Sequence, residues 1–153
     1  MHPNRSAGLR LAGACLLALC CSAAAAQSPV GKWKTIDDET GKQRSIVQIY
    51  EKNGKLYGKI IQLFREPNEE QDPVCNECDR DDPRYNQRVV GMEILTGLVK
   101  DSETFWEDGE ILDPKNGTVY GCEIEVQSRD KLKVRGYIGF SLLGRTQYWY
   151  RVE

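Results

Sequence analysis

The sequence contains one histidine, and it lies in a segment that we expect to be removed. Without His2, the mature chain would carry no imidazole. Nucleophile pairs of serine or cysteine with histidine, and every histidine-ligated metal site, are then excluded. Carboxylate or lysine chemistry stays open, but no nucleophile, base and orienting group stand at a recognisable spacing. We therefore expect a protein that is not an enzyme and holds no cofactor or catalytic metal.

The sequence also lacks a convincing amphipathic helix, an excess of charge and a second long apolar run. Its formal net charge is −2, and loss of Arg5 and Arg10 with the N-terminal segment would make it −4. This balance is ordinary for a soluble domain and argues against nucleic acid as a partner. No segment beyond the first 26 residues is apolar over the roughly 20 residues that a membrane helix needs.

Residues 1–26 have the pattern of an export signal. A basic start is followed by an apolar run that ends in Ala24-Ala25-Ala26, a small-residue cleavage pattern. We predict cleavage before Gln27, which leaves residues 27–153 as one domain in the periplasm or outside the cell. Lipidation is the less favoured alternative, and its candidate residues are Cys15, Cys20 and Cys21.

Short alternating stretches broken by turn signals indicate β-strands in the rest of the chain. Residues 44–51 and 55–63 flank Asn53-Gly54, a strong hairpin signal. This turn sets Tyr50 opposite Tyr57 and Ile49 opposite Gly58. The apolar face of the hairpin is then formed by Val47, Ile49, Leu56, Gly58 and Ile60.

A second hairpin is predicted near the C-terminus, from residues 119–127 and 131–138. A three-residue loop sets Val126 opposite Leu132 and Ile124 opposite Val134. The same register sets Glu125 opposite Lys133 on the solvent face, a charge pair that supports it.

The order of these segments predicts the fold class. Further strands are expected at 30–36, 89–98, 104–109, 109–120 and 145–153. About eight or nine consecutive antiparallel strands without a helical crossover favour an all-β protein, a single up-and-down barrel that leaves no exposed edge. A flattened sandwich is the alternative. About eight strands enclose packed side chains or one small ligand.

Three segments together resemble the bacterial DUF2147 family of exported proteins. They are Gly31–Thr35, residues 91–98 with 109–120, and residues 132–139 with 143–151. The resemblance implies a small lipocalin-like or calycin-like barrel but no defined activity. Gly31-Lys32-Trp33 is similar to the lipocalin Gly-x-Trp of the first strand. By that resemblance Arg151 or Arg145 would pack across Trp33; the alternative is a core tryptophan with a solvated arginine.

Residues 64–88 interrupt the strand pattern with prolines, acids and the motif Cys75-Asn76-Glu77-Cys78. In an oxidising compartment, a structural Cys75–Cys78 disulfide is the favoured interpretation. Redox catalysis and zinc binding are less favoured, because the loop is acidic and no histidine can complete a metal site. Cys122 should be a buried free cysteine, although pairing with Cys75 or Cys78 stays open. The acids around the motif are expected to be solvated rather than to bind calcium.

Two functional hypotheses follow, and neither names a protein partner. The first is an exported protein that binds a small apolar or amphipathic ligand inside the barrel. This hypothesis is based on a pair of small residues, Cys122 and Gly136, which should face each other and leave space for a ligand inside the barrel. The second is a solid barrel that acts in the cell envelope, in protein contacts or stress tolerance, through its acidic Cys-containing loop. The candidate ligand-binding residues are Val47, Ile49, Gly58, Ile60, Cys122, Ile124, Val134 and Gly136.

Overall fold

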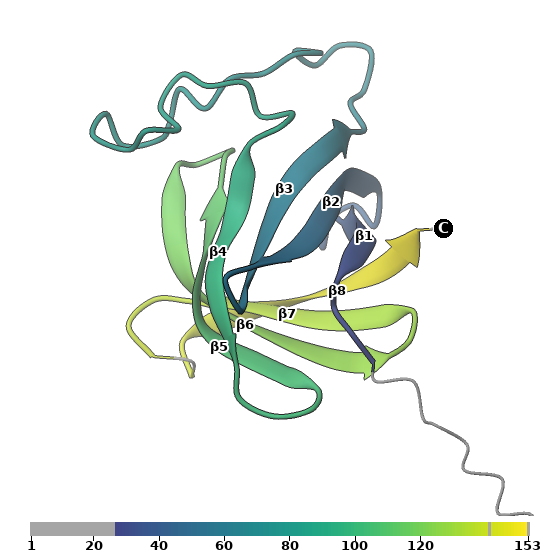
Figure 1. The fold of residues 1–153 in the computed structure, drawn as a ribbon. Helices are drawn as coiled ribbons and strands as arrows, with labels where there is room; N and C mark the ends of the chain where they lie inside the picture. The colour runs from purple at the N-terminus through teal and green to yellow at the C-terminus, as the bar shows by residue number, and fades with distance from the viewer. Residues whose placement is uncertain (1–26, 141, 153) are drawn as a thin grey trace, which may run out of the picture.

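Eight antiparallel strands close into a barrel in the computed structural model, which describes residues 27–140 and 142–152 (Figure 1). The strands are β1 (Gly31–Ile36), β2 (Gln43–Lys52), β3 (Lys55–Leu63), β4 (Glu93–Lys100), β5 (Phe105–Asp113), β6 (Thr118–Ser128), β7 (Lys131–Tyr137) and β8 (Gly144–Val152). Each pairs with the next along the chain, and β8 pairs with β1. The predicted all-β, up-and-down barrel is therefore confirmed. The predicted signal and its cleavage site lie outside the described residues.

Both predicted hairpin registers are present in the barrel. In β2–β3, Tyr50 pairs with Tyr57 and Ile49 with Gly58. Asn53 and Gly54 have φ angles of 53° and 74°, the two positive values that a type I′ turn requires. In β6–β7 the cross-strand pairs are as predicted, with Val126 opposite Leu132. The turn is tighter than expected, because a register shift after Val126 extends the strands to Ser128 and Lys131.

The strand count is eight because two predicted segments belong to one strand. Residues 104–109 and the first part of 109–120 form β5, which ends at Asp113. An irregularity between Trp106 and Gly109, with Asp108 at a φ of 57°, breaks the alternation inside this strand. The break in pattern resembles a strand boundary in the sequence, yet the backbone continues through it as a bulge.

The barrel has two different ends. The connections β1–β2, β3–β4 and β5–β6 lie at one end, which we call the open end. Residues 27–30 lie at the other, closed end, where Pro29 is fully buried and its carbonyl accepts a hydrogen bond from Trp33 Nε1 at 2.7 Å. The β3–β4 connection, residues 64–92, is much longer than the others, and we call it the Cys loop (Figure 1). None of the described segments forms a helix with the length and apolar character that a membrane crossing requires.

Candidate ligand-binding cavity

A cavity of about 370 Å³ lies between the open end of the barrel and the Cys loop. This volume is near the lower end of the range for small-molecule sites, about 300–1,000 Å³. Strand ends supply one side of the wall, and the Cys loop with the β5–β6 turn supplies the other. The apolar side chains that line it include Ile60, Leu63, Phe64, Val89, Ile94 and Leu112.

Two hydroxyl groups in the cavity wall satisfy each other. Thr35 Oγ1 and Ser45 Oγ are 2.7 Å apart across β1 and β2, and both residues are buried. Thr35 Oγ1 also accepts a hydrogen bond from the backbone N–H of Ser45 at 3.1 Å. Because the two hydroxyl groups are hydrogen-bonded to each other, neither of them needs a ligand as a partner, and this part of the wall is only weakly polar.

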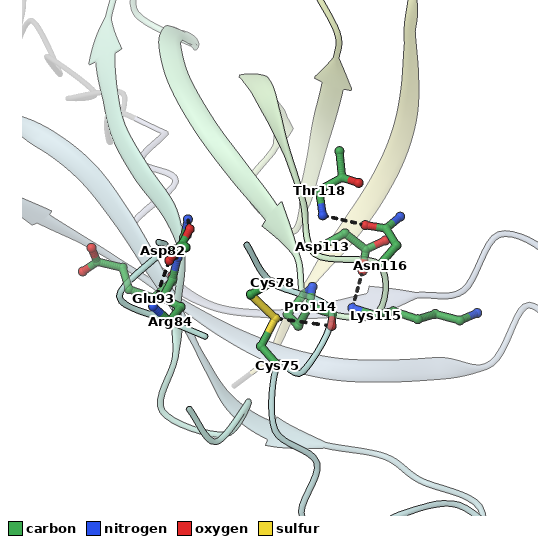
Figure 2. The surroundings of a disulfide bond; sticks show 10 residues. All are labelled: Cys75, Cys78, Asp82, Arg84, Glu93, Asp113, Pro114, Lys115, Asn116 and Thr118. Carbon is green, nitrogen blue, oxygen red and sulfur yellow. Dashed lines mark hydrogen bonds and ion pairs between the residues drawn. A yellow bond between two sulfur atoms is a disulfide. The ribbon is translucent and has the colours of Figure 1, made fainter. Parts of the chain in front are cut away.

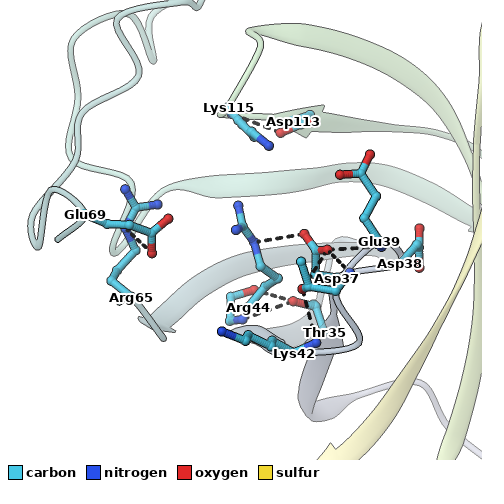
Figure 3. A network of polar contacts seen from close by, with 12 residues as sticks. Thr35, Asp37, Asp38, Glu39, Lys42, Arg44, Arg65, Glu69, Asp113 and Lys115 are labelled. Carbon is cyan, nitrogen blue, oxygen red and sulfur yellow. Dashed lines mark hydrogen bonds and ion pairs between the residues drawn. The ribbon is translucent and has the colours of Figure 1, made fainter. Parts of the chain in front are cut away.

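Three basic side chains, Arg44, Arg65 and Lys115, line the mouth of the cavity, and we call them the basic rim (Figure 3). They come from β2, the start of the Cys loop and the β5–β6 turn. Arg44 Nε lies 3.7 Å from Asp37 Oδ2, and Arg65 Nε lies 3.8 Å from Glu69 Oε2. The backbone N–H of Lys115 donates to Asp113 Oδ1 at 2.9 Å, whereas its Nζ atom has no carboxylate oxygen within 4.0 Å among the described residues.

One acid beside the basic rim, Glu69, does not itself line the cavity, but its Oε2 atom lies 3.8 Å from Arg65 Nε. Glu69 Oε2 accepts a hydrogen bond from the backbone N–H of Glu66 at 2.8 Å. That hydrogen bond, followed by the charges of Arg65, Arg44 and Lys115, lowers the pKa of the Glu69 carboxyl group. Glu69 is therefore ionised at neutral pH and acts as an internal counter-ion of the basic rim.

The Cys loop is held in place by its own backbone hydrogen bonds. Cys75 N donates to Gln87 O at 2.9 Å, and Asn86 N donates to Cys75 O at 2.9 Å. Val89 N donates to Pro73 O at 2.9 Å, so the two arms of the loop run antiparallel. This pairing turns Val89 inward, where it is buried, and places Pro73 and Val74 against the cavity.

The predicted disulfide lies inside the Cys loop, where Cys75 and Cys78 are joined, with Cα atoms 5.4 Å apart (Figure 2). Both cysteines are buried against the β5–β6 turn. A Cβ atom added at Gly117 in that turn would overlap Glu77 O and lie 2.7 Å from Cys78 N. The disulfide therefore shapes the part of the loop that packs against the turn, in contact with the cavity wall.

The structure places the predicted ligand-binding residues mostly below this cavity. Among the eight, Ile60 lines the cavity wall, whereas the other seven do not. A Cβ atom at Gly58 would lie 2.8 Å from Leu95 Cδ1, so Leu95 already fills that space. The seven residues outside the wall are Val47, Ile49, Gly58, Cys122, Ile124, Val134 and Gly136.

The small pair predicted to open a hollow is present, and neither of its residues lines the cavity described above. Cys122 pairs with Gly136 across β6 and β7, as the register predicts. At Gly136 an added Cβ atom would lie 3.5 Å from both Ile111 and Tyr120, which is ordinary packing distance. The space between the small residues is thus filled by larger neighbours, and the cavity lies nearer the open end.

Cys122 is a free, fully buried cysteine, and burial raises the pKa of its thiol. A neutral buried thiol is a poor nucleophile, so this residue acts as a small core side chain. The pairing of Cys122 with Cys75 or Cys78 that the sequence left open does not occur. Within residues 27–140 and 142–152, no three His, Cys, Asp or Glu side chains are grouped so that they could hold a metal ion.

The closed end contains the tryptophan–arginine pair expected from the resemblance. The Arg151 guanidinium carbon lies 4.1 Å from the centre of the Trp33 ring. Arg151 also donates hydrogen bonds to three backbone carbonyls, those of Ser28 (2.9 Å), Val30 (3.1 Å) and Arg129 (2.7 Å). Of the two candidates, Arg151 therefore takes this place, whereas Arg145 forms an exposed ion pair with Asp38 at 2.7 Å.

The residues of the basic rim and of the cavity roof were missed by reasoning from the sequence. One signal was available: Val74 and Val89 are apolar residues in a mostly polar loop of 29 residues. Long loops inside compact domains are uncommon and are often functional. The basic rim had no comparable signal, because Arg44, Arg65 and Lys115 are far apart in the chain.

Comparison with known proteins supports this architecture. The chain matches a solved structure described as protein HP1028 from the human pathogen Helicobacter pylori, which belongs to the lipocalin family. The TM-score is 0.69 at 20% sequence identity, with 81% of this chain and 82% of that chain covered. At this identity the likeness shows a shared fold. No curated protein matches the chain.

A family comparison covers almost all of the barrel. Residues 31–151 match the sequence profile described as "Uncharacterized protein conserved in bacteria (DUF2147)". The matched range runs from the first residue of β1 to the penultimate residue of β8, and it includes the Cys loop and the Trp33–Arg151 pair. The chain therefore belongs to the DUF2147 family.

Proposed function

We propose that this protein binds a small apolar or amphipathic molecule in the cavity at the open end of the barrel. The observation that carries the proposal is a partly open cavity with mostly apolar walls, one side of which is a loop held by a disulfide and by its own backbone pairing. Small-molecule sites are typically concave, mostly apolar and largely preformed. No group in the wall combines a nucleophile with a base, so we expect binding rather than catalysis.

We also propose that the protein acts after export, in the periplasm. The leader pattern of residues 1–26 supports this, and so does a disulfide, which persists in oxidising compartments. Intact-mass analysis of the protein from its host should give a chain that starts at Gln27. A mass that retains residues 1–26 would contradict export by a cleaved signal.

The second hypothesis, a solid barrel that acts through the Cys loop, stays a prediction. Part of the apolar surface of that loop faces the cavity: Val89 is buried, and Pro73 and Val74 contribute to the wall, although Val74 and Val90 are also 40% and 37% exposed. This arrangement favours a loop that covers a ligand over a loop that presents an apolar surface to another protein.

Filling the cavity from the loop side tests the ligand-binding proposal. We expect Val74→Trp to weaken binding of phenylnaphthylamine, a neutral dye that fluoresces in apolar sites, by about tenfold or more, because the indole would occupy space that the dye needs. Val74 is 40% exposed, so the added ring need not disturb the barrel core. Dye titration followed by fluorescence measures the affinity.

Val99→Trp is the matched control. Val99 is 38% exposed on β4 and does not line the cavity, so dye affinity should stay within about twofold of the wild-type value. Equal loss of affinity in both variants, or no dye binding by the wild-type protein, would contradict the proposal.

A further inference from the structure

The mouth of the cavity differs in charge from its interior. Below the mouth the wall is mostly apolar, with side chains such as Ile60, Ile94 and Leu112, and its two hydroxyl groups are paired with each other. At the mouth, three cations from three separate segments converge, as Figure 3 shows for Arg44 and Lys115. An apolar interior with a cationic entrance matches a ligand that has an apolar chain and an anionic end.

The cations of the rim are not fully used by the protein itself. The Arg44–Asp37 and Arg65–Glu69 contacts, at 3.7 and 3.8 Å, are longer than the 2.7–2.9 Å of a well-formed charge-assisted hydrogen bond. The Nζ atom of Lys115 has no carboxylate oxygen within 4.0 Å among the described residues. Arg65 Nε donates to Glu70 O at 2.9 Å, so the donors left at the mouth for an additional anion are the remaining guanidinium N–H groups and the Lys115 ammonium group.

Two acids of the protein lie at this place: Asp113 lines the cavity and accepts a hydrogen bond from the backbone N–H of Lys115 at 2.9 Å, and Glu69 lies beside Arg65. The Glu69 carboxylate is held by the backbone N–H of Glu66, is 32% exposed, and lies in the field of all three rim cations. An entering anionic group would share these cations with Glu69 and be repelled by it. The glutamate thus balances the rim charge in the empty protein and opposes an anionic ligand.

We propose that the cavity binds a single-chain amphiphile with an anionic head group, whose charge lies among Arg44, Arg65 and Lys115 in competition with Glu69. The inference rests on the proposed function, since it specifies the chemistry of the ligand in the same cavity. If the inference is right, the protein binds an amphiphile with an anionic head group more tightly than one with a neutral head group and the same apolar chain. This preference must depend on the side chains of the basic rim.

Competition against bound phenylnaphthylamine tests the preference with two probes of equal chain length, decanoate and decanol. Wild-type protein should bind decanoate about tenfold more tightly than decanol at neutral pH. Arg44→Gln and Lys115→Gln should each lower decanoate affinity more than decanol affinity, and so remove most of this difference. Glu69→Gln should bind decanoate about threefold or more tightly than the wild type, because an opposing charge is removed.

Arg88→Gln is the matched control for charge. Arg88 lies on the Cys loop and pairs with Asp72 on an exposed surface, but it does not line the cavity. The substitution Arg88→Gln removes the same charge as Arg44→Gln, and it should leave the preference for decanoate over decanol unchanged. If Arg88→Gln reduced the preference for decanoate as much as Arg44→Gln does, the preference would come from overall charge, and the proposed head-group site would be overturned.

The outcomes separate the two proposals. Dye binding that Val74→Trp blocks, together with equal affinity for decanoate and decanol, would overturn the head-group inference and leave the proposed function in place. Failure of the wild-type protein to bind the dye, decanoate or decanol would overturn the proposed function itself. Weaker decanoate binding by a folded Glu69→Gln variant would also overturn the competition that we infer.

Discussion

Gly117→Ala is expected to lower the free energy of unfolding by about 3 kcal/mol, more than other single substitutions in the turns of the barrel. Gly117 has a φ of 71°, a left-handed conformation that costs an alanine about 1–2 kcal/mol. The larger part of the effect comes from the clash of the new methyl group with the backbone of Glu77 and Cys78. Because that backbone is held in a disulfide ring, the loop must move away as a unit.

Gly54→Ala separates the clash from the conformational cost. Gly54 has a similar φ of 74°, but nothing lies within 4 Å of the position of an added Cβ atom. Its loss of stability should therefore be about 1–2 kcal/mol. Urea denaturation followed by tryptophan fluorescence measures both variants. Equal losses would show that the β5–β6 turn does not pack on the disulfide ring as described.

Arg151→Lys is expected to lower the free energy of unfolding by about 2–3 kcal/mol, because it removes contacts at the closed end of the barrel. The guanidinium carbon of Arg151 lies 4.1 Å from the centre of the Trp33 ring, and the guanidinium donates to three backbone carbonyls at the same time. A lysine ammonium is a point charge on a flexible stem and cannot make this planar set of contacts. Gly31 permits the arrangement, since a Cβ atom there would overlap Arg151 Nη1.

Arg145→Lys is the control on the same strand. Arg145 pairs with Asp38 on the surface, where its side chain is 63% exposed, and exposed pairs contribute about 0–1 kcal/mol. Thermal unfolding measured by circular dichroism should show a clear shift for Arg151→Lys and little change for Arg145→Lys. Similar small shifts in both variants would mean that the tryptophan–arginine contact contributes little to the barrel.

The barrel was predictable because its register is set locally. The Asn53-Gly54 turn admits one hairpin geometry, and that geometry fixes every pair of β2 and β3 up to the bulge near Val47. In β6–β7, a one-residue slip would set apolar residues against charged ones, so the pattern selects a single register. Both signals act over fewer than twenty residues and need no knowledge of the rest of the chain.

The position of the cavity was not predictable by the same means. Alternation identifies which residues face inward, and Ile49, Cys122 and Ile124 do face inward and are buried. The alternation does not show which part of the barrel interior is filled by large side chains and which part is left empty. That depends on contacts between distant strands, such as Leu95 over Gly58, and on how the Cys loop folds back across the open end. Residues of the rim are therefore brought together only by tertiary structure.

The most direct test of the account is the position of a bound ligand in a crystal structure. A medium-chain fatty acid labelled with bromine at its apolar end would be located by anomalous scattering. The account predicts bromine in the cavity wall formed by Ile60, Ile94 and Leu112, beneath the Cys loop, with the carboxylate at Arg44 and Lys115. Bromine in the interior beside Cys122 and Val134, at the closed end, or on the outer surface of the barrel would contradict it.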